Sequence, residues 1–131
     1  MYKIEKRPSG FIITFSGFVG IDEIKTWKEE SENILKNDVS PNFGVIINMN
    51  GLKPLSADAQ NILVEGQQLY KDGGMYRSAV ILDSPILQMQ FKRLGKRSGI
   101  TDTERYIDAS SVINPIDIAI SWVKDGIDPG L

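Results

Sequence analysis

Two serines that stand just before predicted helices are the residues of this chain best placed to do chemistry. Ser56 precedes a run with helical periodicity, and Ser84 stands directly before Pro85. A serine hydroxyl at a helix N-terminus can accept a phosphate group, and the free N–H groups there can hold an anion. The same hydroxyl can instead cap the helix, which stabilises it by about 1 kcal/mol. Because Asp58 would oppose an added anion, we interpret Ser56 chiefly as a cap.

The chain contains no histidine and no cysteine. Histidine is the commonest general base and metal ligand, and cysteine is needed for thiolate catalysis, disulfides and cysteine-bound zinc. Glu29, Glu30 and Glu32 could suggest acid–base chemistry, but helical spacing puts them on a solvated face. We therefore predict a protein that is not an enzyme and that binds no metal and no cofactor.

Four basic residues cluster in one predicted helix: Lys92, Arg93, Lys96 and Arg97. Cations near a helix C-terminus interact favourably with the helix dipole, so we favour a solvated face. The alternative is a docking site for an acidic partner or a phosphate-bearing ligand. No aromatic residues interleave with the cluster as they do in single-strand nucleic-acid sites, and the net charge is −2. We predict no binding to nucleic acid.

The length of 131 residues, with 41% hydrophobic and 24% charged residues, is typical of one globular domain. We therefore predict a single domain over residues 1–131. No apolar run approaches the roughly 20 residues of a membrane span, and the N-terminus lacks the apolar core of a signal peptide. These features favour a cytoplasmic protein without stable membrane insertion.

Strands and helices that could position these side chains alternate along the chain. Pro8-Ser9-Gly10 forms a turn between the first two of these elements. Strands are predicted over residues 2–7, 11–15, 43–49, 77–82 and 105–108. Helices are predicted over residues 22–37, with Asp22 as cap, and over residues 57–72, 85–98 and 115–126.

The resulting order, β-β-α-β-α-β-α-β-α, predicts an α/β fold with a mixed, mostly parallel sheet, an N-terminal β-hairpin and four helices. Residues 44–49 and 78–82 are apolar almost throughout, which is typical of strands covered on both faces. We predict that these two strands are adjacent and parallel. Trp27 and Trp122 fall on helical stripes and should pack in the core.

Three signatures, in this order, resemble the STAS domain, the family of the bacterial anti-sigma-factor antagonists and the SpoIIAA-like proteins. The first is a strand, a loop containing Gly51 and a helix start, over residues 46–59. The second is Gly73-Gly74, and the third is Asp83-Ser84-Pro85 with Phe91, Leu94 and Ser98-Gly99-Ile100. Together they cover about residues 43–108, and the resemblance implies a SpoIIAA-like fold.

The resemblance also implies a phosphorylation switch at the first signature. Family members often read Asp-Ser-Ser-Gly at the helix start, and the second serine accepts phosphate from a partner kinase. The matching stretch here is Ser56-Ala57-Asp58-Ala59, so the acceptor position holds Asp58, which has no hydroxyl. Asn48 stands where the family often has Asp. We therefore predict a divergent member that is not controlled by a phosphoserine switch.

Fold and resemblance together predict a non-catalytic, regulatory protein-interaction module. Its surface should lie at the C-terminal edge of the parallel strands, where open α/β sheets usually bind ligands. The predicted partner-binding residues are Asn48, Asn50, Gly51, Ser56, Asp58, Ser84 and Gln88. The sequence does not name the protein partner, and a homodimer is compatible with it.

The alternative function is that of a carrier or sensor of a small apolar or lipid-like ligand. A cavity between helices and sheet would then hold the ligand. Gly66, Met75, Met89 and Phe91 are its candidate lining residues, and plain core packing accounts for them equally well.

Overall fold

One five-stranded sheet organises the protein, whose computed structural model describes residues 1–37 and 42–130. The strand order is β1-β2-β3-β4-β5, so each strand pairs with its neighbour in the sequence. The pair β1–β2 is antiparallel and the other three pairs are parallel, which confirms the predicted mixed sheet. The strands are β1 (Tyr2–Arg7), β2 (Gly10–Phe15), β3 (Phe43–Asn48), β4 (Met75–Leu82) and β5 (Glu104–Asp108).

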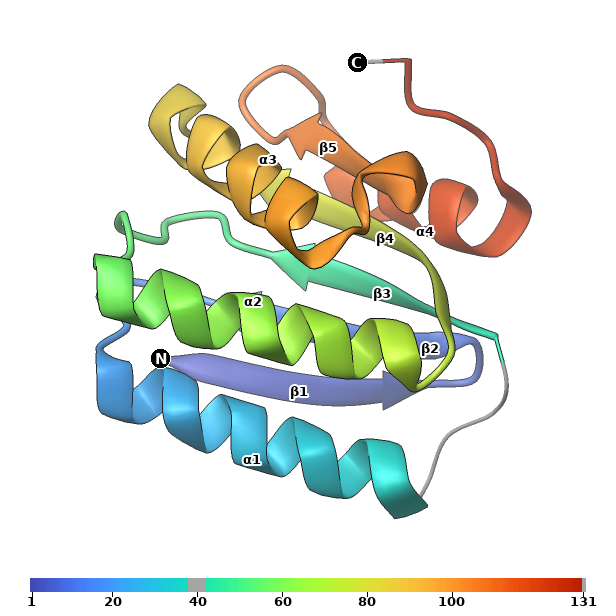
Figure 1. The fold of residues 1–131 in the computed structure, drawn as a ribbon. Coiled ribbons are helices and arrows are strands. Elements are labelled where there is room, and N and C mark those ends of the chain that lie inside the picture. The colour runs from blue at the N-terminus through green and yellow to red at the C-terminus, as the bar shows by residue number, and fades with distance from the viewer. Residues whose placement is uncertain (38–41, 131) are drawn as a thin grey trace.

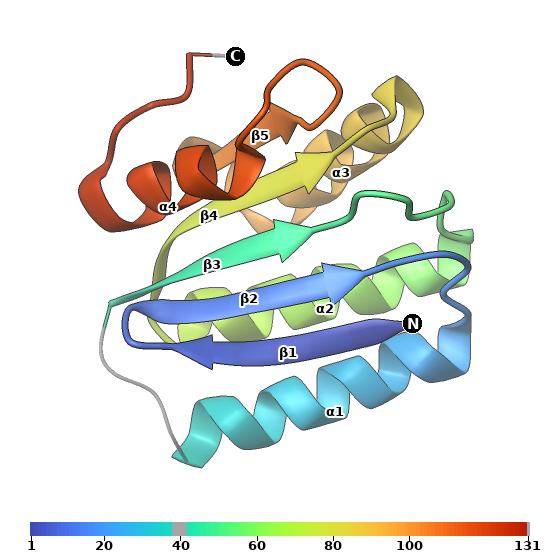
Figure 2. The ribbon, with the colours of Figure 1, turned by 180° about the vertical axis from the view of Figure 1, so that it is seen from behind.

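Four helices cover the two faces of this sheet unequally. Three of them, α1, α2 and α3, form a layer on one face (Figure 1). The fourth, α4, lies alone on the other face against β3, β4 and β5 (Figure 2). The helices are α1 (Ile21–Asn37), α2 (Ala57–Asp72), α3 (Pro85–Ser98) and α4 (Pro115–Asp125). Among the described residues, none of the helices combines the length and the apolar character that a membrane crossing requires.

The alternation of side chains along the strands divides the core into two clusters. Phe11, Ile13 and Phe15 of β2 point toward the three-helix layer. Ile46 of β3 and Ile107 of β5 pack with α4 on the opposite face. Residues 43–47 of β3 and 79–82 of β4 are buried and apolar because helices cover both faces of the sheet there, and the two strands are adjacent and parallel as predicted.

Both tryptophans are buried in this core, as predicted. Trp27 of α1 packs edge-to-face against Phe15 and stacks on Tyr70. Trp122 of α4 donates its indole N–H to the Ser78 carbonyl oxygen at 2.9 Å. Each tryptophan therefore fastens a helix to the sheet or to a neighbouring helix.

Several predicted boundaries differ from the observed ones by one or two residues, and two of the differences have a clear cause. Asp22 is not the cap of α1, because the helix already includes Ile21 and the Gly20 carbonyl oxygen accepts the Ile24 N–H at 3.1 Å. The aspartate instead lies in the first turn, where its charge complements the helix dipole. The fourth strand begins at Met75 rather than Arg77, since a register shift beside Phe43 lets the pairing with β3 start earlier.

Candidate interaction surface

The parallel strands β2, β3, β4 and β5 all end at the same edge of the sheet (Figure 2). The structure places every predicted partner-binding residue at this edge or in the helix turns that follow it. Asn48 ends β3, and Asn50 and Gly51 belong to the next turn. Ser56 is the N-cap of α2 and Asp58 lies in its first turn. Ser84 is the N-cap of α3 and Gln88 lies in its first turn. We use the term C-terminal edge for this set of loops and helix starts.

Backbone hydrogen bonds tie the loops of the C-terminal edge to one another. The Gly17 N–H donates to the Gly51 carbonyl oxygen at 3.1 Å, and the Lys53 N–H donates to the Gly17 carbonyl oxygen at 3.0 Å. Asn48 closes the same turn, because its Oδ1 accepts the Asn50 N–H at 3.2 Å. Gly51 has φ = 87°, a conformation that favours glycine. The loops after β2 and β3 therefore form one bonded unit.

A second set of bonds joins this unit to α3. Gln90 of α3 accepts the Leu55 N–H at 3.1 Å, and the Leu55 carbonyl oxygen accepts the Gln60 side-chain amide at 2.9 Å. Leu55 is buried, so its backbone groups need protein partners. The starts of α2 and α3 are consequently held in a defined relation, which a preformed binding surface requires.

Both candidate serines cap helices. Ser56 Oγ accepts the Ala59 N–H at 3.2 Å, and Ser84 Oγ accepts the Leu87 N–H at 3.4 Å. Ser56 is also exposed, as is Asp58 in the first turn of α2. The predicted capping role of Ser56 is confirmed, and its hydroxyl stays accessible from solvent.

The capping bond predicts a graded response to substitution at residue 56. Ser56→Ala should lower the free energy of unfolding by about 1 kcal/mol, whereas Ser56→Asp and Ser56→Asn should be nearly neutral because both side chains cap helices. Chemical denaturation of the three variants measures this ranking. A Ser56→Asp variant that loses as much stability as Ser56→Ala would contradict the capping role.

Several exposed apolar side chains lie along the C-terminal edge, and the sequence interpretation did not predict their exposure. Phe18, in the loop after β2, is 74% exposed, and Met89, in the second turn of α3, is 73% exposed. Met1, Ile86 and Ile113 are also large, exposed and located at this edge. The position of Phe18 within the glycine-containing segment 17–20 was the one sequence signal for its exposure, because such a segment offers an aromatic ring little packing.

The cluster of basic residues on α3 lies beside this surface and is solvated, as predicted. Arg93 donates to Gln60 Oε1 at 3.0 Å, and Arg97 donates to Asn61 Oδ1 at 2.8 Å. Lys92 lies over the ring of Tyr106, with Nζ 5.5 Å from the centroid. Both guanidinium groups are thus positioned by neutral amides of α2, and no carboxylate among the described residues pairs with them.

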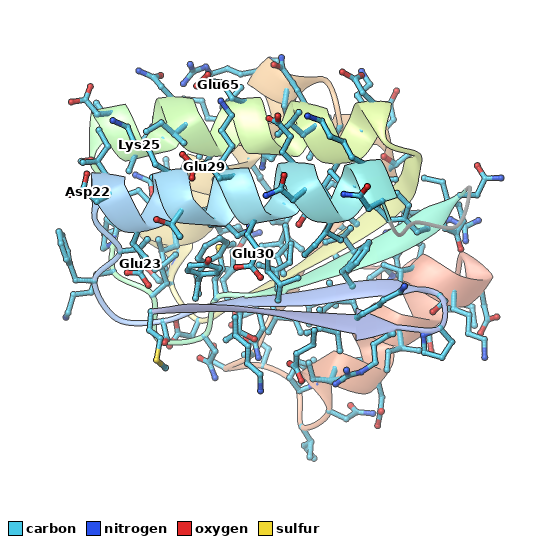
Figure 3. All side chains as sticks on the ribbon, turned by 90° about the horizontal axis from the view of Figure 1, so that it is seen from below. Asp22, Glu23, Lys25, Glu29, Glu30 and Glu65 are labelled. Atoms are coloured by element: carbon cyan, nitrogen blue, oxygen red, sulfur yellow. The ribbon has the colours of Figure 1, made fainter. Side chains whose placement is uncertain are left out.

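The acidic residues Glu29 and Glu30 of α1 point in different directions, Glu29 toward α2 and Glu30 toward β1 (Figure 3). Glu30 accepts the Tyr2 hydroxyl at 2.5 Å, while Glu29 is exposed to solvent. A salt bridge of 3.2 Å joins Lys28 to Glu65 and links α1 with α2. Throughout residues 1–37 and 42–130, the acidic side chains form no group of three that could hold a metal ion.

A small apolar cavity with a volume of about 20 Å³ lies between the sheet and the three-helix layer. Met75 and Phe91 line it, as the alternative function predicted. Gly66 does not, because it packs against Trp27, and Met89 points to solvent. A cavity of this size holds about one water molecule, far less than a lipid-like ligand needs.

This arrangement defines an α/β domain of the SpoIIAA-like fold, and solved structures with that fold resemble it. One is the anti-sigma factor antagonist SpoIIAA in its unphosphorylated form, with 10% sequence identity, a TM-score of 0.60, and coverage of 89% of this chain and 96% of that chain. Another is an uncharacterized DUF3478-family protein with a SpoIIAA-like fold from Shewanella loihica PV-4. It has 15% identity, a TM-score of 0.65, and coverage of 94% of this chain and 92% of that one.

No protein-family model matches the sequence, and the search of curated proteins gives no match. The similarity to these solved structures confirms, at the level of the fold, the resemblance predicted from the three signatures. Sequence identities this low establish the shared fold alone, since one fold supports many functions.

Proposed function

We propose that this chain is a non-catalytic regulatory module that binds a protein partner with its C-terminal edge. The observation that carries the proposal is that Met1, Phe18, Ile86, Met89 and Ile113 are all exposed along that edge, from the start of β1 to the loop after β5. Single exposed apolar side chains are common on protein surfaces, but several at one site indicate an interaction surface. Ile21, the first residue of α1, is also exposed at this edge, whereas Ile127 follows the far end of α4.

The rigidity of the loops supports this proposal. Binding costs less when the contact surface is already ordered, and the bonds through Gly17, Gly51 and Leu55 supply that order. Flexible, apolar side chains such as Met89 adapt well to a partner surface, and Phe18 could enter a pocket as an anchor. The similarity to a solved anti-sigma factor antagonist is consistent with a regulatory role exerted through protein binding.

The test is affinity capture from the native organism with Phe18→Asp/Met89→Asp as the variant. We expect the wild-type chain to capture a specific protein that the double variant does not capture. The affinity of the double variant for that protein should be at least about 30-fold lower, because a buried anchor residue contributes about 2 kcal/mol or more. Ile127→Asp is the matched control, since Ile127 is 60% exposed but follows the far end of α4.

Two outcomes would contradict the proposed surface. One is equal capture by the wild-type chain and the double variant, and the other is loss of capture in the Ile127→Asp control. Light scattering of the free chain addresses the homodimer separately. If the partner is a second copy, the wild-type chain should have twice the mass of one chain, and the double variant should have the mass of one chain.

A further inference from the structure

Glu104, the first residue of β5, is a buried carboxyl group that the proposed function does not use. The residue is 3% exposed and lies beneath α3. A Cβ atom added to Gly95 would come within 2.6 Å of Glu104 Oε1, so the glycine allows the helix to pass over the carboxyl group. Ser78 of β4 donates to Oε2 at 3.2 Å, and the Tyr106 hydroxyl contacts Oε1.

A proton on Glu104 would allow both close contacts of the Tyr106 hydroxyl to be hydrogen bonds. The Tyr106 hydroxyl lies within bonding distance of two oxygens, Glu104 Oε1 and, at 3.1 Å, the Phe91 carbonyl oxygen of α3. A phenol carries one hydrogen and cannot donate to both. If Oε1 is protonated, Glu104 donates to the Tyr106 hydroxyl, and the Tyr106 hydroxyl donates to the Phe91 carbonyl oxygen. Both contacts of the Tyr106 hydroxyl are then hydrogen bonds.

Ionisation of Glu104 would change this connection between strand and helix. The carboxylate can no longer donate, and it attracts the single hydrogen of Tyr106 to itself. The Phe91 carbonyl oxygen then loses its hydrogen bond from β5. A buried charge would also remain beneath α3, which is costly without a cationic partner.

The charged groups around Glu104 do not supply that partner. Lys92 and Lys96 of α3 line the adjoining surface groove, but no salt bridge joins either of them to Glu104 in the described structure. Arg105 of β5 instead pairs with Asp128 at 2.9 Å. From the other elements packed nearby, the polar groups are Gln67 of α2 and Thr101 and Asp102 of the short turn before β5.

Solvent can nevertheless deliver and remove the proton. The groove between α3 and β5 has a volume of about 400 Å³, and Glu104 and Tyr106 both line it. Burial raises the pKa of Glu104 to about 7, although the hydrogen bonds from Tyr106 and Ser78 act in the opposite direction. Burial and the neighbouring Glu104 also raise the pKa of Tyr106 well above its usual range, so the phenol keeps its proton.

We propose that a proton held by Glu104 docks α3 onto β5, and that this helix loosens when the carboxyl group ionises. The device is independent of the proposed partner. Since the folded state raises the pKa from 4.5 to about 7, its stabilisation is fully present below pH 4.5. It is lost progressively as the pH rises from 4.5 to about 7, where the folded state ionises as well.

The first test is a direct titration of the wild-type chain by NMR. The side-chain carboxyl carbon of Glu104 should titrate with a midpoint near pH 7. Glu29, which is exposed on α1, provides the reference signal in the same sample. A Glu104 midpoint near the ordinary value of 4.5 would overturn the proposal, whatever the behaviour of any variant.

The second test is hydrogen exchange of the amides over residues 91–98, corrected for the intrinsic effect of pH. Protection in the wild-type chain should fall by up to about 300-fold as the pH rises from well below 4.5 to well above 7, which corresponds to the 2.5 pH units between the two pKa values. Glu104→Gln should remain protected, because its amide can donate to Tyr106 and accept from Ser78. Glu29→Gln is the exposed control and should behave like the wild-type chain.

Two results of the exchange experiment would also overturn the proposal. One is constant protection of α3 in the wild-type chain across this pH range. The other is an equal fall in the wild-type chain and in Glu104→Gln. If Glu104→Gln does not fold, the wild-type titration alone decides between the two midpoints.

Discussion

Replacement of Phe91 by alanine should lower the free energy of unfolding by about 3–5 kcal/mol, the usual cost of removing a buried aromatic ring. Phe91 is almost completely buried, and it joins α3 to the main core cluster. Its ring already borders the interior cavity of about 20 Å³, so the space left by the ring would enlarge an existing void. The neighbouring elements cannot refill this space, since the sheet on the other side is fixed by its hydrogen bonds.

Chemical denaturation measures this loss, and two variants on the same helix serve as controls. Phe91→Leu should lose much less stability because it keeps most of the apolar volume. Met89→Ala should change the free energy of unfolding by no more than about 0.5 kcal/mol, since Met89 is exposed. A loss below about 2 kcal/mol in Phe91→Ala would contradict the described packing of α3.

Gly66→Ala should also destabilise the protein, by about 1–3 kcal/mol, although alanine is the better helix former. Gly66 lies in α2 where α1 approaches, and an added Cβ atom would overlap Cζ3 and Cη2 of Trp27. The indole cannot move aside easily, because it stacks on Tyr70 and meets Phe15 edge-to-face. The overlap must therefore separate α1 from α2.

Trp27→Phe should rescue the Gly66 variant, because phenylalanine lacks the two ring atoms that overlap the new methyl group. The rescue also removes the Trp27 indole N–H, which is buried without a hydrogen-bond partner among the described residues. The double-mutant cycle should show a favourable coupling of about 1 kcal/mol or more. Gln68→Ala, at an exposed position of the same helix, controls for helix propensity. If the losses of stability in Gly66→Ala and Trp27→Phe were additive, direct contact between residues 66 and 27 would be excluded as the cause of the destabilisation.

The two functional inferences meet in α3. Its first turns carry Ile86 and Met89 of the C-terminal edge, and its middle rests on the Glu104 network through Phe91. A helix loosened at its middle would present these apolar residues less rigidly. Partner capture at pH 5.5 and pH 8 would therefore connect the two proposals, while each keeps its own independent test.

Much of this protein is determined by local sequence. The helices begin where Ser56 and Ser84 can cap them and end at glycines such as Gly73 and Gly99, because capping depends on neighbouring backbone groups. The continuous apolar runs of β3 and β4 indicate burial on both faces, which only a central, parallel position supplies. These periodicities were sufficient to predict the element order and the parallel core, and the resemblance carried by the three signatures implied the SpoIIAA-like arrangement.

The tertiary structure alone decided which side chains meet and which remain exposed. Met89 has an apolar side chain and was assigned to a cavity, but the orientation of α3 turns it toward solvent beside the C-terminal edge. Gly66 was assigned to the same cavity, and the close approach of α1 fills that space with Trp27. Glu104 was not recognised at all, because a carboxylate at the start of a short strand is normally exposed. Its burial results from contacts with α3 and β4, and sequence periodicity carries no information about contacts between distant segments.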